Sequence, residues 1–271
     1  MSLRLKPTFA VDLAAADRPL AGIWACAGSP VITEICAGAG LDWLLIDMEH
    51  SPDDLASVQA QLQVAAGYPV TTVVRVPSGD PVIIKRVLDL GAQNLLVPMV
   101  SSAADAEAAV AAVRYPPKGQ RGVGSALARS ARWGRVDDYL TDADDHVSLL
   151  VQVETVAGVD HAGEIAAVDG VDGVFVGPSD LAASMGLLGQ QTHPDVTAAV
   201  LRTFEAVRTA GTFVGVNAFD PDAAQAYADA GANFLAVSAD VTLVARGSDA
   251  LAERWSIKSD HEQGERPTHA G

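Results

Sequence analysis

Ionisable side chains follow two long apolar runs in the first third of the sequence. Asp47, Glu49 and His50 come directly after the uninterrupted run Trp-Leu-Leu-Ile at 43–46, and Arg75 lies at the end of the next run. Carboxylates can hold a divalent cation, an imidazole can move a proton, and a guanidinium can bind a carboxylate or a developing oxyanion. Brought together by the fold, these groups would suit acid/base chemistry on a small acid.

A second set of polar residues ends the predicted strands 148–154 and 173–177. Glu154 is the last residue of the first strand, and Asp180 lies shortly after the second. If the two strands are neighbours in a sheet, their backbones would lie roughly 5 Å apart. Two hard carboxylates with open coordination positions suit Mg²⁺ or Mn²⁺ rather than zinc. The alternative is that both acids cap the helices that follow them.

Each of the other candidates also has a plainer interpretation. Arg75 could belong to a structural ion pair, and a histidine without acidic neighbours is more often structural than catalytic. His50 lies close to Asp47 and Glu49 in sequence, which favours a general acid/base role. The stretch Gly-Pro-Ser at 177–179 leads into a helix whose free N–H groups could bind a carboxylate, or it is simply a turn.

The elements that must position these groups alternate between strand and helix. We expect strands at 22–26, 42–50, 70–76, 93–98, 148–154, 173–177, 213–217 and 233–237. We expect helices at 9–17, 30–39, 52–66 with Ser51 as N-cap, 81–90, 103–114, 157–167, 181–185, 194–210, 221–230 and 241–254. Eight strand–helix units predict an α/β fold, a (β/α)8 TIM barrel, in which the carboxyl ends of all strands meet at one mouth.

The barrel and its N-terminal helix would form a single domain over 1–255. The segment 115–147 is long and irregular, and loops of this length are usually functional or disordered. The polar stretch 256–271 is expected to be a disordered tail. A doubly wound open sheet is the alternative fold, but no GxGxxG turn or GxxxxGK[ST] loop is present, so neither that fold nor a nucleotide cofactor is favoured.

Composition narrows the class of function. The net charge of −16, from 34 acids and 18 bases, argues against nucleic acid or an anionic membrane as a partner. The chain lacks a signal-peptide pattern and a long apolar run, so we expect a cytoplasmic protein with a small-molecule substrate. None of the four lysines ends a predicted strand, so a Schiff-base lysine and PLP are not expected, and a carbanion would need a metal.

The motifs as a group resemble the HpcH/HpaI aldolase family, which comprises metal-dependent (class II) pyruvate aldolases of the phosphoenolpyruvate/pyruvate barrel superfamily. The resemblance covers about 20–255 and looks closest to the 4-hydroxy-2-oxoheptanedioate aldolase branch. The matching stretches are 38–50, 95–100, 114–117 with 121–129, 151–155 and 170–181.

The resemblance implies a role for each matched residue. Glu154 and Asp180 would bind the divalent metal, which could be Mg²⁺, Mn²⁺ or Co²⁺. Arg75 would contact the ketone oxygen and the enolate of pyruvate, and His50 would be the acid/base residue. The remaining catalytic residues would be Asp47 and Asp89, of which Asp89 pairs with the histidine. The substrate would be bound by Trp24, Gln152, Gly177, Pro178, the Ser179 backbone and Asn217.

The implied reaction is retro-aldol cleavage of a 4-hydroxy-2-oxo acid to pyruvate and an aldehyde, with His50 taking the C4 hydroxyl proton. The residues after 217 differ from those of many relatives, so the identity of the aldehyde product is left open.

Relatives are typically hexamers, trimers of dimers, with exchanged C-terminal helices. Helix 241–254 could therefore serve such an exchange, or it could be an ordinary eighth barrel helix. The rival functions are a CoA-ester lyase, a 2-oxo-acid decarboxylase and a non-catalytic 2-oxo-acid-binding barrel.

Overall fold

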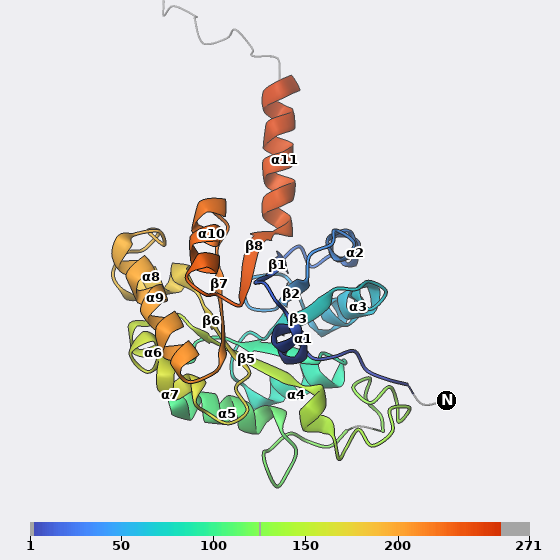
Figure 1. The fold of residues 1–271 in the computed structure, drawn as a ribbon. Helices are drawn as coiled ribbons and strands as arrows, with labels where there is room; N and C mark the ends of the chain where they lie inside the picture. The colour runs from blue at the N-terminus through green and yellow to red at the C-terminus, as the bar shows by residue number, and fades with distance from the viewer. Residues whose placement is uncertain (1–2, 125, 256–271) are drawn as a thin grey trace, which may run out of the picture.

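Eight parallel strands form a closed barrel in the computed structural model, which describes residues 3–124 and 126–255 (Figure 1). Each strand pairs with the next in sequence, and β1 pairs with β8 to close the sheet. The predicted (β/α)8 barrel is therefore confirmed. The strands are β1 (Leu20–Ala25), β2 (Trp43–Asp47), β3 (Thr71–Arg75), β4 (Asn94–Val97), β5 (Ser148–Val153), β6 (Gly173–Val176), β7 (Phe213–Asn217) and β8 (Phe234–Ala239).

The apolar runs form strands because helices cover the outside of the barrel and side chains fill its inside. All residues of β2, β4, β5 and β6 are buried, which explains why these runs show no polar alternation. Aromatic rings fill the interior, where Trp43 packs edge-on against Phe175 and Phe234. Gly22 makes room for this packing, since a Cβ there would lie 2.2 Å from the Trp43 ring.

Helices follow the strands and surround the barrel. They are α1 (Phe9–Ala15), α2 (Pro30–Ala37), α3 (Leu55–Ala65), α4 (Pro81–Asp89), α5 (Ala103–Val113), α6 (Val156–Asp160), α7 (Ala162–Ala166), α8 (Pro178–Ser184), α9 (Pro194–Thr209), α10 (Pro221–Asp229) and α11 (Asp240–Trp255), with a short 3₁₀ helix η1 (Ala143–His146). Proline stands in the first turn of several of them, where its missing N–H costs nothing. Phe9 of α1 packs against Trp43 and Phe234 and so closes the amino-terminal mouth of the barrel.

Three predicted helices differ from the observed ones. The helix expected from 52 begins at Leu55, because Asp54 rather than Ser51 caps it: Asp54 accepts hydrogen bonds from the N–H groups of Ala56 and Ser57. The helix expected at 157–167 is two short helices that meet at His161. The helix expected from 181 begins at 178, so its first turn carries Asp180.

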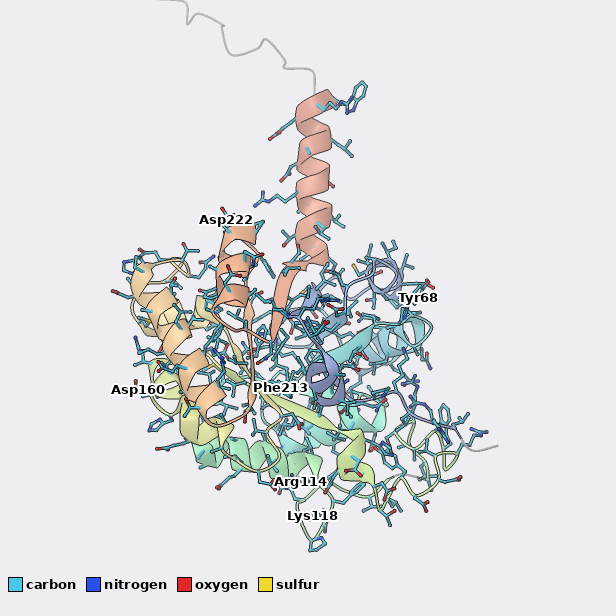
Figure 2. All side chains as sticks on the ribbon, in the orientation of Figure 1. Tyr68, Arg114, Lys118, Asp160, Phe213 and Asp222 are labelled. Atoms are coloured by element: carbon cyan, nitrogen blue, oxygen red, sulfur yellow. The ribbon has the colours of Figure 1, made fainter. Side chains whose placement is uncertain are left out.

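Helix α11 does not pack on the barrel as an eighth outer helix. It leads away from the strands, and its side chains stand out from it on all sides (Figures 1 and 2). Only Asp240, its first residue, is buried. The predicted tail 256–271 lies outside the described residues. Within residues 3–124 and 126–255, no helix is long and apolar enough to cross a membrane.

Candidate active site

A cavity of about 280 Å³ lies at the carboxyl-terminal mouth of the barrel. Every residue predicted for the site lines it except Glu154 and Asp89. The predicted residues that line it are Trp24, Asp47, His50, Arg75, Gln152, Gly177, Pro178, Ser179, Asp180 and Asn217. As expected for a parallel barrel, residues from the carboxyl ends of several strands therefore meet at this cavity.

Arg75, the last residue of β3, is buried and held from three sides. Its Nε and Nη2 donate hydrogen bonds to Oδ1 and Oδ2 of Asp47, both at 2.8 Å, and its Nη1 lies 2.7 Å from Oε2 of Glu49. The guanidinium also stacks over the Trp24 ring, 4.2 Å from the ring centroid. These contacts fix the guanidinium group of Arg75 in one orientation at the wall of the cavity.

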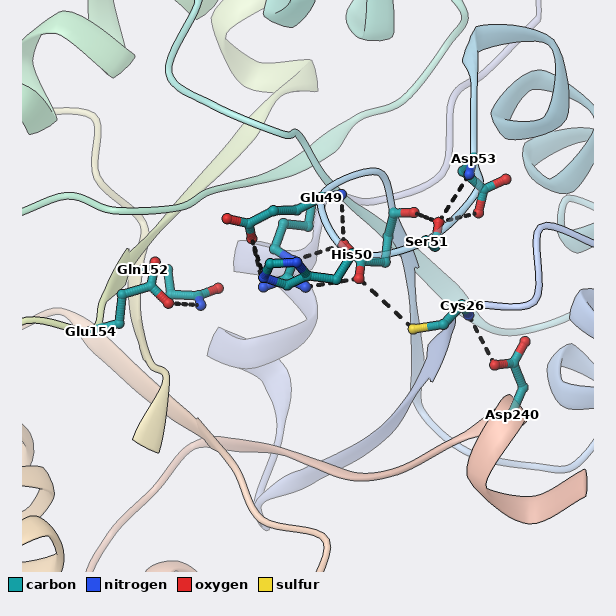
Figure 3. A network of polar contacts seen from close by, with 10 residues as sticks. Cys26, Glu49, His50, Ser51, Asp53, Gln152, Glu154 and Asp240 are labelled. Carbon is teal, nitrogen blue, oxygen red and sulfur yellow. Dashed lines mark hydrogen bonds and ion pairs between the residues drawn. The ribbon is translucent and has the colours of Figure 1, made fainter. Parts of the chain in front are cut away.

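Glu154 follows β5 and is almost completely buried. Its Oε1 accepts a hydrogen bond from the Met99 N–H at 2.7 Å, and its Oε2 accepts one from Nε2 of Gln152 (Figure 3). Burial raises the pKa of Glu154 to about 7, and the nearby charges of Glu49 and Asp180 act in the same direction. Much of this carboxyl is therefore protonated at neutral pH unless a cation comes close.

The surroundings of Glu154 fit a divalent cation. The negative charges of Glu49 and Asp180 raise the pKa of Glu154, and the charge of Asp180 also raises the pKa of Glu49. Oε1 of Gln152 is buried without a hydrogen-bond partner. In the described part of the chain, no three His, Cys, Asp or Glu side chains are arranged to hold a metal ion by themselves. If Glu154 and Asp180 held a cation, its other ligands would have to come from substrate and water, which Mg²⁺ and related ions accept.

His50 lies at the rim of the cavity. Its side chain is 65% exposed, and its Nε2 lies 3.9 Å from Oε2 of Glu49. Asp89 does not reach it within one chain. Asp89 ends α4, which runs antiparallel to the strands, and it lies at the opposite mouth with its Oδ1 3.6 Å from Nη2 of Arg121. Within one chain Asp89 therefore contacts Arg121 and not His50, and its pairing with the histidine stays a prediction.

Sequence reasoning misses residues that shape the site. The sequence indicates Glu49 only as an acidic neighbour of His50, whereas in the structure Glu49 also holds Arg75. Asp240 accepts hydrogen bonds from the N–H groups of Cys26 at 2.9 Å and Ala27 at 3.1 Å, and so fixes the turn after β1 (Figure 3). It too is an acid at a strand end, but the predicted last strand stops at 237, short of it.

The Cys26 thiol lies next to the Arg75–Asp47 pair. Its Sγ lies 3.8 Å from Oδ2 of Asp47. Burial raises the pKa of Cys26 to about 12, and the charges of Asp47 and Asp240 add to this effect. The surroundings therefore favour the thiol over the nucleophilic thiolate.

Comparisons with known proteins agree with this geometry. A family model described as HpcH/HpaI aldolase/citrate lyase matches residues 20–247. The chain is 51% identical over 248 residues to the hydroxypyruvate/pyruvate aldolase of Deinococcus radiodurans, covering 92% of this chain and 90% of that protein. It is 48% identical over 249 residues to the 4-hydroxy-2-oxo-heptane-1,7-dioate aldolase of Salmonella paratyphi C, covering 92% and 95%.

A solved structure is also similar. The HpcH/HpaI aldolase/citrate lyase family protein from Burkholderia cenocepacia J2315 superimposes with a TM-score of 0.87 at 44% identity, covering 91% of this chain and 98% of that one. The two relatives carry aldolase names, so the chain is an enzyme of the carbon–carbon lyase class. They give no support to a CoA-ester lyase, a decarboxylase or a non-catalytic barrel. Since the family model matches most of its length, the chain belongs to the HpcH/HpaI aldolase/citrate lyase family.

Proposed function

We propose that this aldolase cleaves a 4-hydroxy-2-oxo acid, such as 4-hydroxy-2-oxoheptanedioate, into pyruvate and an aldehyde with the help of a divalent metal. The observation that carries the proposal is the Arg75 guanidinium, which Asp47 and Glu49 hold at the wall of the cavity that Asp180 also lines. A guanidinium fixed in this way suits a substrate that develops negative charge on a ketone oxygen.

Glu154 and Asp180 would hold the metal, which we propose to be Mg²⁺, Mn²⁺ or Co²⁺. A bound divalent ion would supply Lewis-acid stabilisation of negative charge that develops on the substrate. The buried position of Glu154, its N–H donor from Met99 and the unpaired Oε1 of Gln152 support this assignment. Gln152 and the Ser179 backbone would contact the pyruvate moiety.

Arg75 has donors left for the substrate. A guanidinium carries five N–H groups, and the contacts to Asp47 and Glu49 use three of them. The remaining N–H groups lie on Nη1 and Nη2, at the wall of the cavity. Arg75 would therefore donate to the ketone oxygen and hold its charge as pyruvate leaves in the enolate form. Asp47 serves as the positioning residue that keeps the fork in place.

His50 would accept the C4 hydroxyl proton at the start of cleavage. Its exposed position at the cavity rim allows proton exchange with water, and Glu49 lies beside it. The rest of the pocket is closed by Trp24, Gly177, Pro178 and Asn217. The Nε1 of Trp24 and the Oδ1 of Asn217 are buried without hydrogen-bond partners, so each can bond to an oxygen or hydroxyl group of a substrate.

We further propose a cytoplasmic homohexamer, a trimer of dimers, in which α11 packs on a neighbouring subunit. The support is that α11 leaves its own barrel (Figure 1) and that large apolar side chains along it are exposed. An assembly would also allow Asp89 of one subunit to approach His50 of another.

A coupled pyruvate-release assay tests the proposed reaction. Metal-depleted protein would be offered several 4-hydroxy-2-oxo acids of different chain length, with a chelator or with added Mg²⁺, Mn²⁺ or Co²⁺. We expect release of pyruvate only after metal is added, with rates that depend on the aldehyde part. Full activity in chelator would exclude the metal assignment, and no release from any of these acids would exclude the substrate class.

A further inference from the structure

A second cavity, of about 240 Å³, lies at the amino-terminal mouth of the barrel, on the face opposite the active site. Four cationic side chains line it: Arg4, Lys6, Arg129 and Arg132. The protein as a whole carries a net charge of −16 and only 18 lysines and arginines, so this gathering of cations runs against its overall charge. Among the described residues, no acidic side chain lines the cavity.

The two arginines of the irregular segment 115–147 converge on one point. The Nη1 atoms of Arg129 and Arg132 lie 2.6 and 2.8 Å from the position that a Cβ would take on Gly91. Gly91 has a φ of +94°, which suits glycine, and its lack of a side chain leaves room for both guanidinium groups. Arg129 and Arg132 therefore lie close together at one wall of the cavity.

Backbone carbonyls hold these arginines in place. Nη1 of Arg129 donates to the carbonyl of Leu90 at 2.9 Å, and Nη1 of Arg132 donates to the carbonyl of Arg129 at 2.6 Å. Among the described residues neither arginine forms an ion pair, and the same holds for Arg4 and Lys6. Burial lowers the pKa of both Arg129 and Arg132, and the charge of Arg132 lowers that of Arg129 further. Half-buried, mutually repelling cations are stabilised by a bound anion.

The walls of the cavity are fixed by other contacts. The Leu3 N–H donates to the carbonyl of Arg135 at 2.8 Å, and Leu5 packs against the small apolar core of the segment 115–147. Nε2 of Gln93, just before β4, donates to the carbonyl of Lys6 at 3.0 Å. The cationic groups are thus positioned by backbone and apolar contacts, and their charges are left for a ligand.

We propose that this amino-terminal cavity binds a small oxyanion carrying more than one charge, of the phosphate or phosphate-monoester class. Forked guanidinium groups match the geometry of phosphate oxygens, and the volume suits a small anion rather than a chain segment. Such a ligand would contact both the N-terminal segment and the segment 115–147. It would therefore hold these two parts of the chain together at the amino-terminal mouth of the barrel.

Calorimetric titration of the intact protein with inorganic phosphate tests the proposal, with sodium chloride at equal ionic strength as the reference and phenyl phosphate as a second probe. We expect saturable phosphate binding and a rise in Tm. Arg4→Gln, which removes an exposed side chain, should weaken binding several-fold, and Arg129→Gln with Arg132→Gln should weaken it more than about tenfold. Arg202→Gln, an exposed arginine on α9, is the matched control and should leave the affinity unchanged.

The two probes separate the possible ligands, since binding of phenyl phosphate as well as phosphate points to an organic monoester and binding of phosphate alone to the free ion. The proposal is overturned if phosphate gives no saturable binding beyond the chloride reference. It is also overturned if Arg75→Gln abolishes phosphate binding while the Arg129 and Arg132 variants keep it, because the anion would then sit in the catalytic mouth. Should the double variant fail to fold, Arg4→Gln alone decides: unchanged affinity contradicts the site.

Discussion

At the scale of single residues, Arg75 links the stability of the fold to the chemistry of the mouth. Removing it leaves Asp47, which is 1% exposed, as a buried charge without its partner. Arg75→Ala should therefore lower the free energy of unfolding by about 3–5 kcal/mol. It should also lower kcat by at least about 100-fold, because an oxyanion donor is lost. Urea unfolding and the pyruvate-release assay measure the two effects separately.

Arg75→Lys separates charge from geometry. An ammonium keeps the positive charge beside Asp47 but cannot bridge Asp47, Glu49 and a substrate oxygen at once. We expect this variant to recover part of the lost stability and little of the lost activity. A lysine variant with near-normal kcat would show that positive charge alone suffices. It would contradict the proposal that the planar guanidinium group is needed to bind the substrate oxygen. Arg202→Lys serves as the surface control.

Glu154 should make the metal-free protein sensitive to pH. A glutamate whose pKa rises from 4.5 to about 7 binds more protons in the native than in the unfolded state within that window. Its contribution to stability therefore falls as pH rises from 4.5 to 7, by about 3 kcal/mol in total. Glu154→Gln removes this titration, and Gln152 can turn its amide to face the new side chain.

The measurement is the difference in urea unfolding free energy between the Glu154→Gln variant and the wild type, both metal-depleted, from pH 5 to pH 8. Taking the difference removes titrations that the two proteins share. We expect the variant to gain stability relative to the wild type as pH rises, and to lose metal binding at every pH. A difference that stays constant with pH would show that Glu154 does not ionise in this window.

The sequence predicts those residues of the carboxyl-terminal mouth that lie at the end of a buried apolar strand. His50, Arg75 and Glu154 can be found because a parallel barrel places all strand ends together. Asp89 cannot be placed in the same way, because its helix returns to the other mouth and no pattern in the sequence indicates which residue the end of that helix will contact. Asp240 is not predicted as a site residue, because the predicted last strand stops at 237. In the structure β8 continues for two more residues and so ends next to Asp240.

At the scale of elements, the junction between β6 and α8 has little room. A Cβ on Gly177 would lie 2.9 Å from Oε2 of Glu154 and 3.0 Å from Nε2 of Gln152. Gly177→Ala should displace these side chains and lower kcat/KM by about 100-fold, the size of effect expected from a shift of about 1 Å at a reacting centre. Metal affinity, measured by calorimetry, should fall together with activity.

An exposed glycine outside the site provides the control for this substitution. Gly67 follows α3, and a Cβ added there would meet only the carbonyl of Val64 at 3.5 Å, an ordinary contact, so Gly67→Ala should keep full activity. Normal activity in Gly177→Ala would mean that the junction relaxes easily and that Glu154 is not held as tightly as its contacts indicate.

Element boundaries are predicted less well than element types. Ser51, Asp53 and Asp54 can each cap a helix, so the sequence alone does not choose among them. In the structure the Ser51 hydroxyl donates to the carbonyl of Asp47 and to Asp53, which leaves Asp54 to form the cap. The same competition between local and tertiary hydrogen bonds limits any boundary derived from sequence.

At the scale of the whole molecule, α11 carries apolar side chains that its own barrel does not cover. Val241, Val244, Leu251 and Trp255 are spaced by three, seven and four residues, which places them on one side of the helix. All four are between 44% and 73% exposed. A stripe of this kind on a helix that leaves its own barrel is typical of a helix that packs on another subunit.

Charges placed on this stripe should break the assembly. We expect Val244→Asp with Leu251→Asp to convert the proposed hexamer into smaller species, measured by sedimentation velocity, because buried carboxylates cannot be accommodated in an apolar contact. Arg246→Glu is the matched control, since Arg246 is 80% exposed on the opposite side of the helix and pairs there with Asp249.

The same variant links assembly to catalysis. Val241 and Thr242, in the first turn of α11, line the catalytic cavity, so the direction in which the helix leaves the barrel affects the shape of the mouth. Loss of assembly should therefore raise KM for the 2-oxo acid, whereas Arg246→Glu should leave it unchanged. If the double aspartate variant keeps the sedimentation coefficient of the wild type, the stripe is not a subunit contact and the proposed exchange of helices is wrong.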